Sequence, residues 1–368
     1  MNVTNVERQA GQSLVLIALM MMGFLAFLGL VIDGGATLVT RRRGQDAADS
    51  AAFAGARVLA MRPTNGITVE QQISNTIATF AYANRVSSSD VTASFIDQSG
   101  NNICRLNNNC NGVPTSPLAT GVRVTTTLRF QPYFINIIIG NSQIPIQSIA
   151  AAQSGTPTAS SDLMPVVVPW SPCPGQPYTS TTCTQFTYGS VVTLQGGQTT
   201  SGGFQWLTFN DCSGNGDVAD YLSGRQLPLR PVVTDPTDQY INTPDMPAPS
   251  PWVCGNTGFA SSNAVRSALD DWLNPALHPS GAIWTVPVFN SFIGTGNSAK
   301  YHIVLFAEFQ LLGYDFNGQR NPHTFHCPGS GNNKCIQGMF LRMVKPLQMV
   351  PGLCNNNGLD MCSIGLSQ

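Results

Sequence analysis

An uncharged apolar run near the N-terminus constrains this chain more than any other feature. Residues 13–32 contain no Asp, Glu, Lys, Arg or His and consist mainly of Leu, Met, Ala, Val, Ile, Phe and Gly. Twenty such residues in an α-helix cover about 30 Å, which is the thickness of a bilayer's hydrocarbon core. A cleavable signal peptide has a shorter apolar centre and a cleavage site of small residues after it. We therefore predict one transmembrane helix over this run.

The sequence after the apolar run also has helical periodicity. Small residues recur four positions apart in two adjacent rows, which are Ala47, Ala51 and Gly55 in one and Ala48, Ala52 and Ala56 in the other. One helical face therefore has little side-chain bulk, and another helix can pack closely against it. We predict a helix over residues 13–60 that continues beyond the membrane as a stalk and packs with other helices. The alternative is that Gly34 and Gly35 divide it into a span and a separate helix, because each Gly costs a helix interior about 1 kcal/mol.

Charged residues begin where the apolar run ends. Arg42 has Asp46 four positions later and Asp49 a further turn on, a spacing that predicts paired charges along the stalk. We expect Asp33 to pair with Arg8 or with the N-terminus of a neighbouring copy. The alternative for Asp33 is a hydrated carboxylate at the level of the lipid headgroups.

Three motifs in this region carry a family resemblance. They are GQSLVLIAL from residue 11, VIDGG from residue 31 and RRRGQDAADSAAFAGA from residue 41. Together they resemble the N-terminal segment of the TadE/TadG-like proteins of tight-adherence (Flp-type) pilus assembly, single-span proteins related to minor pilins. The positions that fall at the family's spacing are Gly11, Asp33, Gln45, Ala48, Asp49, Ala51 and Ala52. The resemblance implies pilus or other membrane-complex subunits as partners.

One position departs from the pilin-like pattern. Relatives commonly carry a Glu five residues after the glycine that corresponds to Gly11, and this chain has Leu16 there. We therefore do not expect prepilin-type cleavage after Gly11, and residues 1–12 are expected to remain as an N-terminal leader.

The cysteines predict the compartment of the C-terminal part. All ten follow the apolar run, and their spacing favours five near-neighbour pairs, although sequence cannot fix connectivity: Cys104 with Cys110, Cys173 with Cys183, Cys212 with Cys254, Cys327 with Cys335, and Cys354 with Cys362. Disulfides persist in oxidising compartments, so we expect the C-terminal part to be extracytoplasmic or on the cell surface. The excess of basic residues at 41–43 over Arg8 predicts the opposite orientation. We give the cysteines more weight, because these arginines lie some nine residues beyond the apolar run and have Asp46 and Asp49 nearby.

Beyond the stalk, the sequence predicts an α+β chain with two further parts. A helix over 68–85, capped by Thr68, and strands at 91–96, 122–130, 134–139 and 144–152 form a small pilin-like α+β module, residues 61–153. Residues 154–163 are small and polar and are predicted as a linker. Short β runs separated by Gly, Pro and Asn then predict a disulfide-rich, mainly-β domain over 164–368, a sandwich or barrel with one helix at 262–273.

Motifs for catalysis and cofactor binding are weak. The sequence has no G-x-S-x-G, H-E-x-x-H or Walker motif, so we expect neither enzymatic activity nor a cofactor. A weak calcium candidate comprises Asp211, Ser213, Asn215 and Asp217, but Leu222 stands where a calcium loop has its bidentate acid. A weak zinc candidate comprises His323, His326, Cys327 and Cys335, whose cysteines we expect to form a disulfide instead. A net charge of −1 argues against nucleic acid as a partner.

These observations favour a non-enzymatic, membrane-anchored structural or assembly protein of a Tad/Flp-type pilus or related surface apparatus. Its partners would be membrane lipid, other transmembrane helices and complex subunits, including copies of itself. Two alternatives stay open: an accessory subunit of another membrane complex, and an adhesin-like binding module. In the second, stacking platforms would come from the tryptophans, which are Trp170, Trp206, Trp252, Trp272 and Trp284.

Overall fold

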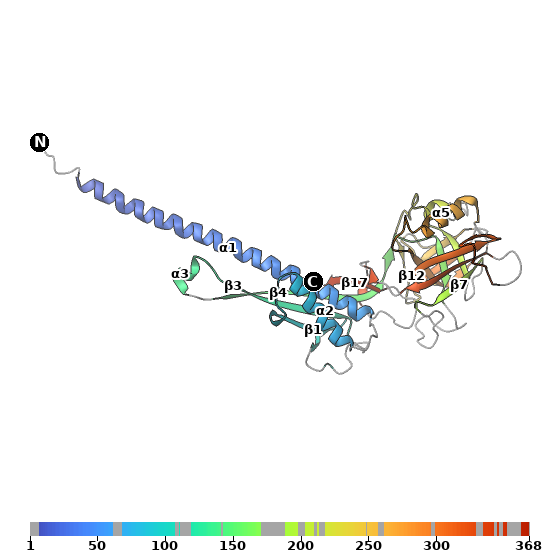
Figure 1. Ribbon diagram of the computed structural model, residues 1–368, viewed down its shortest axis with the longest axis horizontal. Helices are drawn as coiled ribbons and strands as arrows, with labels where there is room; N and C mark the ends of the chain where they lie inside the picture. The colour runs from blue at the N-terminus through green and yellow to red at the C-terminus, as the bar shows by residue number, and fades with distance from the viewer. Residues whose placement is uncertain are drawn as a thin grey trace. The chain divides into compact units, whose positions relative to one another are not determined.

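The chain forms two units in the computed structural model shown in Figure 1. The structure describes residues 7–61, 68–106, 110, 119–140, 143–170, 188–197, 203–209, 212, 218–247, 249–256, 261–295, 299–328, 334–341, 344–345, 349–351 and 362–367. The first unit comprises Met1–Leu59, Pro63–Ala152 and Leu366–Gln368, and the second comprises Ala60–Arg62 and Gln153–Gly365. A long apolar helix is thus followed by mixed α+β structure with large β-sheets, as the sequence predicts.

The first helix is unbroken. Helix α1 runs from Glu7 to Met61 (Figure 1) and passes through Gly34 and Gly35 without interruption. A Cβ atom at either glycine would meet nothing within 4 Å, so neither is needed for a close contact. The alternative of two separate helices is therefore wrong. Helix propagation is cooperative, and two glycines cannot outweigh the many strong helix formers on both sides.

The first unit packs a short helix and a sheet against α1. Helix α2 (Val69–Ala83) begins at Thr68, whose Oγ1 accepts a hydrogen bond from the Gln71 N–H at 3.2 Å. It buries Ile73, Ile77 and Ala81, which lie on one face at helical spacing. A 3₁₀ turn, η1 (Ser88–Asp90), leads into a sheet with the strand order β2–β1–β3–β4. These strands are β1 (Val91–Ile96), β2 (Asn102–Arg105), β3 (Gly121–Phe130) and β4 (Ile144–Pro157).

One expectation for this part of the chain is wrong. Residues 134–139 were expected as a strand, but the structure has a short helix there, α3 (Ile135–Ile139). The carboxylate of Asp33 accepts the N–H groups of residues 133–135, so those groups are unavailable to a sheet and suit the first turn of a helix. The isoleucines favour a strand by propensity, and this tertiary contact overrides it.

The linker predicted at 154–163 begins next to the boundary between the two units, which falls between Ala152 and Gln153, and it contains short strand pairings. Strand β4 continues to Pro157, and its residues 155–157 pair antiparallel with β16 (Met349–Pro351). Farther on, β5 (Ala159–Ser160) pairs with β9 (Val232–Val233). Small polar side chains such as Gln153 and Ser154 are buried here, because strand pairing satisfies the backbone whatever the side-chain pattern.

The second unit contains a closed β-barrel. Its strands are β6 (Val166–Pro169), β7 (Val191–Gly196), β8 (Gly203–Thr208), β11 (Ala282–Ile293), β12 (Lys300–Phe316) and β14 (Lys334–Leu341). The pairing order is β12–β11–β6–β8–β7–β14, and β14 pairs with β12 again, so the path closes. The pairs β6–β11 and β7–β8 are parallel, and the other pairs are antiparallel. Strand β10 (Trp252–Gly255) adds pairings with β8 and β12.

Large apolar side chains form the core of this unit. Trp206, Trp284, Phe204, Phe309 and Phe316 are almost completely buried. Helices α4 (Val218–Leu222) and α5 (Asn263–Leu273) contribute to the same core. The remaining short strands are β13 (Gln319–Asn321), β15 (Val344–Lys345) and β17 (Cys362–Ser367). The sequence predicted a mainly-β sandwich or barrel, and the closed path of strands shows that it is a barrel.

Candidate functional site

The first half of α1 has an apolar surface that is largely exposed in the part of the chain that the structure describes. Its large side chains from Leu14 to Ile32 are exposed throughout. Among the described residues, α1 is the one helix long and apolar enough to cross a membrane. An exposed apolar surface of this length is a binding surface for lipid or for other apolar helices.

The second half of α1 carries the two rows of small residues, and the structure buries them. Ala47, Ala48, Ala51, Ala52 and Ala56 are each 0% exposed. The face they form lies against helix α2 of the same chain. A Cβ atom built at Gly55 would lie 3.1 Å from Cδ1 and Cγ1 of Ile77 and 3.6 Å from Cγ2 of Ile73.

The sheet covers the part of this face nearer the apolar half. A Cβ atom at Gly44 would lie 2.9 Å from Oγ of Ser148. Thr126 donates its hydroxyl hydrogen to the Gly44 carbonyl at 3.0 Å, and Ser148 donates to the Arg41 carbonyl at 3.3 Å. Gln45 Nε2 donates to the carbonyl of Ile149 at 3.2 Å. The helix backbone and the strands β3 and β4 can approach this closely only because the helix side chains are small.

These contacts give the small residues a partner within the same chain. We expected their face to pack with other helices, and helix α2 packs against it together with the strands β3 and β4. The spacing of the small residues does not say where the partner comes from, because a face without bulk accepts an internal partner as readily as an external one.

Asp33 also has an internal partner. Its Oδ1 accepts a hydrogen bond from the Tyr133 N–H at 2.7 Å, and its Oδ2 accepts from the Phe134 and Ile135 N–H groups at 2.9 and 2.8 Å. The side chain is almost completely buried. The hydrated alternative is therefore wrong, and the pairing expected with Arg8 or a neighbouring N-terminus would involve a carboxylate that already has three donors. Three N–H groups at the start of α3 satisfy the carboxylate more completely than one flexible cation would.

The charge pairs expected on the stalk are absent as well. Within the described part of the chain, no ion pair joins Arg42 to Asp46 or Asp49. Asp49 instead accepts a hydrogen bond from Gln45 Nε2 at 2.9 Å. Arg42 and Asp46 are both exposed, and a water-exposed pair gains too little to fix two long side chains.

Three disulfides are present at the predicted pairings. Cys104 is bonded to Cys110, Cys212 to Cys254, and Cys327 to Cys335. Cys362 is also disulfide-bonded, whereas Cys173, Cys183 and Cys354 lie outside the described residues.

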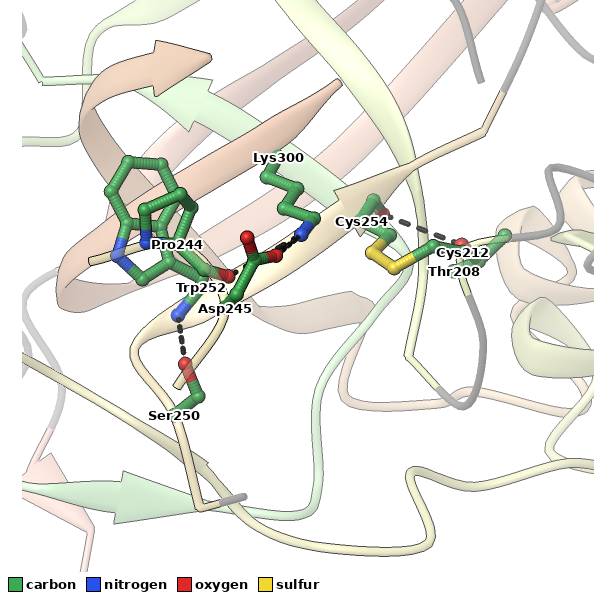
Figure 2. The surroundings of a disulfide bond; sticks show 8 residues. All are labelled: Thr208, Cys212, Pro244, Asp245, Ser250, Trp252, Cys254 and Lys300. Atoms are coloured by element: carbon green, nitrogen blue, oxygen red, sulfur yellow. Dashed lines mark hydrogen bonds and ion pairs between the residues drawn. A yellow bond between two sulfur atoms is a disulfide. The ribbon is translucent and has the colours of Figure 1, made fainter. Parts of the chain in front are cut away.

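The Cys212–Cys254 bridge has the longest sequence separation of the three, 42 residues. Figure 2 shows that it ties Cys212, which follows β8, to β10 beside Thr208 and the ion pair of Lys300 with Asp245. In the same view Trp252 donates its backbone N–H to Ser250 Oγ at 3.1 Å. The bridge therefore joins the segment after β8 to β10, which pairs with β8.

The structure reveals a buried polar cluster that the sequence did not indicate. Nε2 of His302 lies 2.9 Å from Oδ2 of Asp235, and its Nδ1 lies 2.8 Å from Oδ1 of Asn290. Asn290 donates its own Nδ2 hydrogen to Asp238, which fixes its oxygen toward the histidine. Both ring nitrogens therefore face acceptors. His302 is 0% exposed and Asp235 is nearly so.

Burial alone would raise the pKa of Asp235, but hydrogen bonds oppose it. The N–H groups of Tyr240 and Gln239 and the ring of His302 donate to this carboxylate, and the charge of His302 adds to their effect. The net shift of the pKa is downward. The cluster ties the loop 235–240 to β12 and is closed to solvent, so a substrate has no access to it. No sequence signal could have found it, because its members lie tens of residues apart.

The metal candidates gain no support. Asp211, Ser213, Asn215 and Asp217 lie outside the described residues. Cys327 and Cys335 are joined to each other and cannot bind zinc. Among the residues that the structure describes, no three His, Cys, Asp or Glu side chains gather closely enough to hold a metal ion.

The tryptophans do not form an exposed platform. Trp170, Trp206, Trp252 and Trp284 are buried, and Trp272 is partly buried, with Trp284 at 6.2 Å between ring centroids. The adhesin-like alternative therefore loses the feature on which it depended.

The sequence comparison agrees with the N-terminal motifs. Residues 11–58 match the sequence model of the family described as Flp pilus-assembly TadE/G-like. No curated protein and no solved structure matches the chain. The matched segment covers the apolar run, Asp33 and both rows of small residues. Residues 11–58 are therefore a TadE/G-like Flp pilus-assembly segment, as the three motifs predicted.

Proposed function

We propose that this protein is a non-enzymatic, membrane-anchored assembly protein of an Flp-type pilus or a related surface apparatus. Residues 13–32 of α1 cross the bilayer once, and the part of the chain that follows them lies on the extracytoplasmic side. The observation that carries this proposal is the exposed apolar surface of α1 within the segment that matches the TadE/G-like family.

The packing of the small residues supports different roles for the two halves of α1. Its second half holds α2, β3 and β4 through the face that includes Ala48, Ala52 and Gly55. Within its first half, the large side chains from Leu14 to Ile32 are apolar and exposed. The first half of α1 then anchors the protein in the membrane, and its second half forms part of the folded first unit. Contacts of this protein with other subunits involve the first half of α1 or the surface of either unit.

Three disulfides support the extracytoplasmic orientation, since such bonds persist in oxidising compartments. The arginines at 41–43 favour the opposite orientation by charge, but all three are exposed on the helix surface. The barrel supports a structural role more than a catalytic one, because its buried pair of His302 and Asp235 is closed to solvent.

Affinity capture tests the proposed partner. The full chain, tagged at its C-terminus, is extracted from native membranes in mild detergent and the proteins that co-purify are identified. Pilus subunits or secretion components of the same apparatus are the expected result. An unrelated membrane complex would instead favour the accessory-subunit alternative.

Thiol labelling tests the orientation independently. After reduction, a membrane-impermeant maleimide added to intact cells should label Cys212 and Cys254. Protection in intact cells, with labelling only after lysis, would contradict the extracytoplasmic orientation. A double Cys212→Ser and Cys254→Ser variant is the control for labelling at these positions.

A further inference from the structure

We propose that the chain has a second membrane contact, the tip of the hairpin between β3 and β4, residues 131–140. This hairpin tip inserts its apolar side chains into the outer interface of the bilayer beside α1. The inference rests on the proposed function, because it takes residues 13–32 to be the membrane span.

The position of the tip comes from its contacts with α1. Figure 1 shows α3, at the end of β3, beside the helix. The tip binds Asp33, the first residue after the apolar run, through three N–H groups. Phe134 reaches one turn farther, since a Cβ atom at Gly29 would lie only 2.8 Å from its Cβ and Cγ atoms. At about 1.5 Å per residue, Gly29 lies about 4 to 5 Å inside the end of the run at Ile32. Phe134 therefore reaches the level of the hydrocarbon boundary.

The surface of the tip is apolar. Tyr133 is 69% exposed, Phe134 41% and Ile137 80%. The sequence contains no charged residue between Arg129 and Asp162. Large apolar side chains at the end of a hairpin are unfavourable in water, whereas a Tyr beside Phe and Ile is typical of a membrane interface. The exposed side chains of Leu30, Val31 and Ile32 on α1 continue this surface into the span.

The carboxylate that the tip contacts is also arranged for this environment. A carboxylate at the edge of the hydrocarbon needs partners, and so do the free N–H groups at the start of a helix. Asp33 and residues 133–135 satisfy each other. The hairpin tip thus satisfies the charge of Asp33 with its own N–H groups and presents apolar side chains outward. A position in water would not require this arrangement.

Depth-dependent quenching tests the proposal in the full chain. The Ile137→Cys variant carries the environment-sensitive fluorophore NBD on the new thiol, with the native disulfides kept oxidised. It is reconstituted in vesicles of phosphatidylcholine and phosphatidylglycerol. Quenchers are spin-labelled phospholipid within the bilayer and iodide in water. Two matched variants are Leu25→Cys, in the apolar run (59% exposed), and Tyr82→Cys, on α2 (77% exposed).

We expect the probe at position 137 to be quenched by spin-labelled lipid several-fold more strongly than the probe at 82. Iodide should quench it several-fold more weakly. Adding Asp33→Ala should move the probe at 137 toward the behaviour of the probe at 82, because the tip loses its attachment. The probe at 25 should remain lipid-quenched in that variant.

Each other outcome overturns the proposal in a different way. If lipid quenches position 25 but not 137, while iodide quenches 137, the anchor stands and the tip lies in water. If neither quencher reaches 137, another protein copy covers the tip instead of lipid. If lipid quenches neither 25 nor 137, the proposed anchoring itself fails.

Discussion

Replacement of Gly55 by Leu should weaken the attachment of α2 to α1. The Cβ atom alone would lie 3.1 Å from Cδ1 and Cγ1 of Ile77, closer than ordinary van der Waals contact. The three further carbons of Leu would enter space that Ile73 and Ile77 already fill, and both are almost completely buried. Overpacking of this kind costs about 1–3 kcal/mol. The gain in helix propensity does not offset it, since α1 stays helical when α2 detaches.

Hydrogen exchange measures this detachment directly. Amides of α2 that exchange through local opening report its free energy, so a cost of about 1–3 kcal/mol should accelerate them about 5- to 150-fold in detergent micelles. Gly55→Ala is the graded control, because the ends of the Ile77 side chain can move by a few tenths of an ångström, and its effect should be much smaller. Arg57→Leu adds a Leu at an exposed position of α1 and should leave α2 unchanged. If α2 exchange is unchanged in Gly55→Leu while the association state of the chain shifts, the internal packing is refuted. The face of small residues would then pack against another subunit.

Three other predictions follow from the contacts of single residues. Asp33→Ala should accelerate hydrogen exchange of the amides of residues 133–135 about tenfold or more, because these amides lose their acceptor, and α2 exchange should be unchanged. Equal protection of these amides in the variant would contradict their hydrogen bonds to Asp33. The double variant Cys212→Ser, Cys254→Ser should destabilise the second unit by about 4 kcal/mol in denaturant unfolding, as the chain-entropy relation gives for its 42-residue separation, whereas a loss below about 1 kcal/mol would show that the loop is held by other contacts. Because the pKa of Asp235 is lowered in the folded state, its contribution to stability is present above about pH 4 and is lost as the pH falls below that; Asp235→Asn should flatten the pH dependence of unfolding in this range, and an unchanged slope would contradict the assignment.

The parts of the fold that sequence could predict are those set by local periodicity. Helix α2 was expected at 68–85 with its cap at Thr68, and short β runs were expected in the part of the chain that forms the barrel. The periodicity of apolar residues and the positions of turn residues are local signals, so they can be read without knowledge of the rest of the chain. The Ile-rich run at 135–139 shows the limit, because its conformation depends on a carboxylate about 100 residues earlier in the sequence.

The candidate site shows the same limit. Spacing identified the two rows of small residues and the position of Asp33, since both are patterns along one helix. Neither pattern contains its partner, and both partners belong to the same chain. The cluster of Asp235, Asn290 and His302 left no local pattern at all, because its members come from different segments that only the barrel brings together.

Internal use of the small residues restricts how copies of this protein can associate through α1. Close approach of two helices requires small residues at the interface, and the rows that include Ala48 and Ala52 are covered by α2 and the sheet. In the apolar run of α1 the exposed small residues include Ala18, Gly23 and Ala26, which do not recur four positions apart as the rows of the second half do. Their neighbours are large and exposed, including Met20 and Phe27. Contacts between helices in this half must therefore pack large apolar side chains against one another at a wider spacing than the rows of small residues would allow.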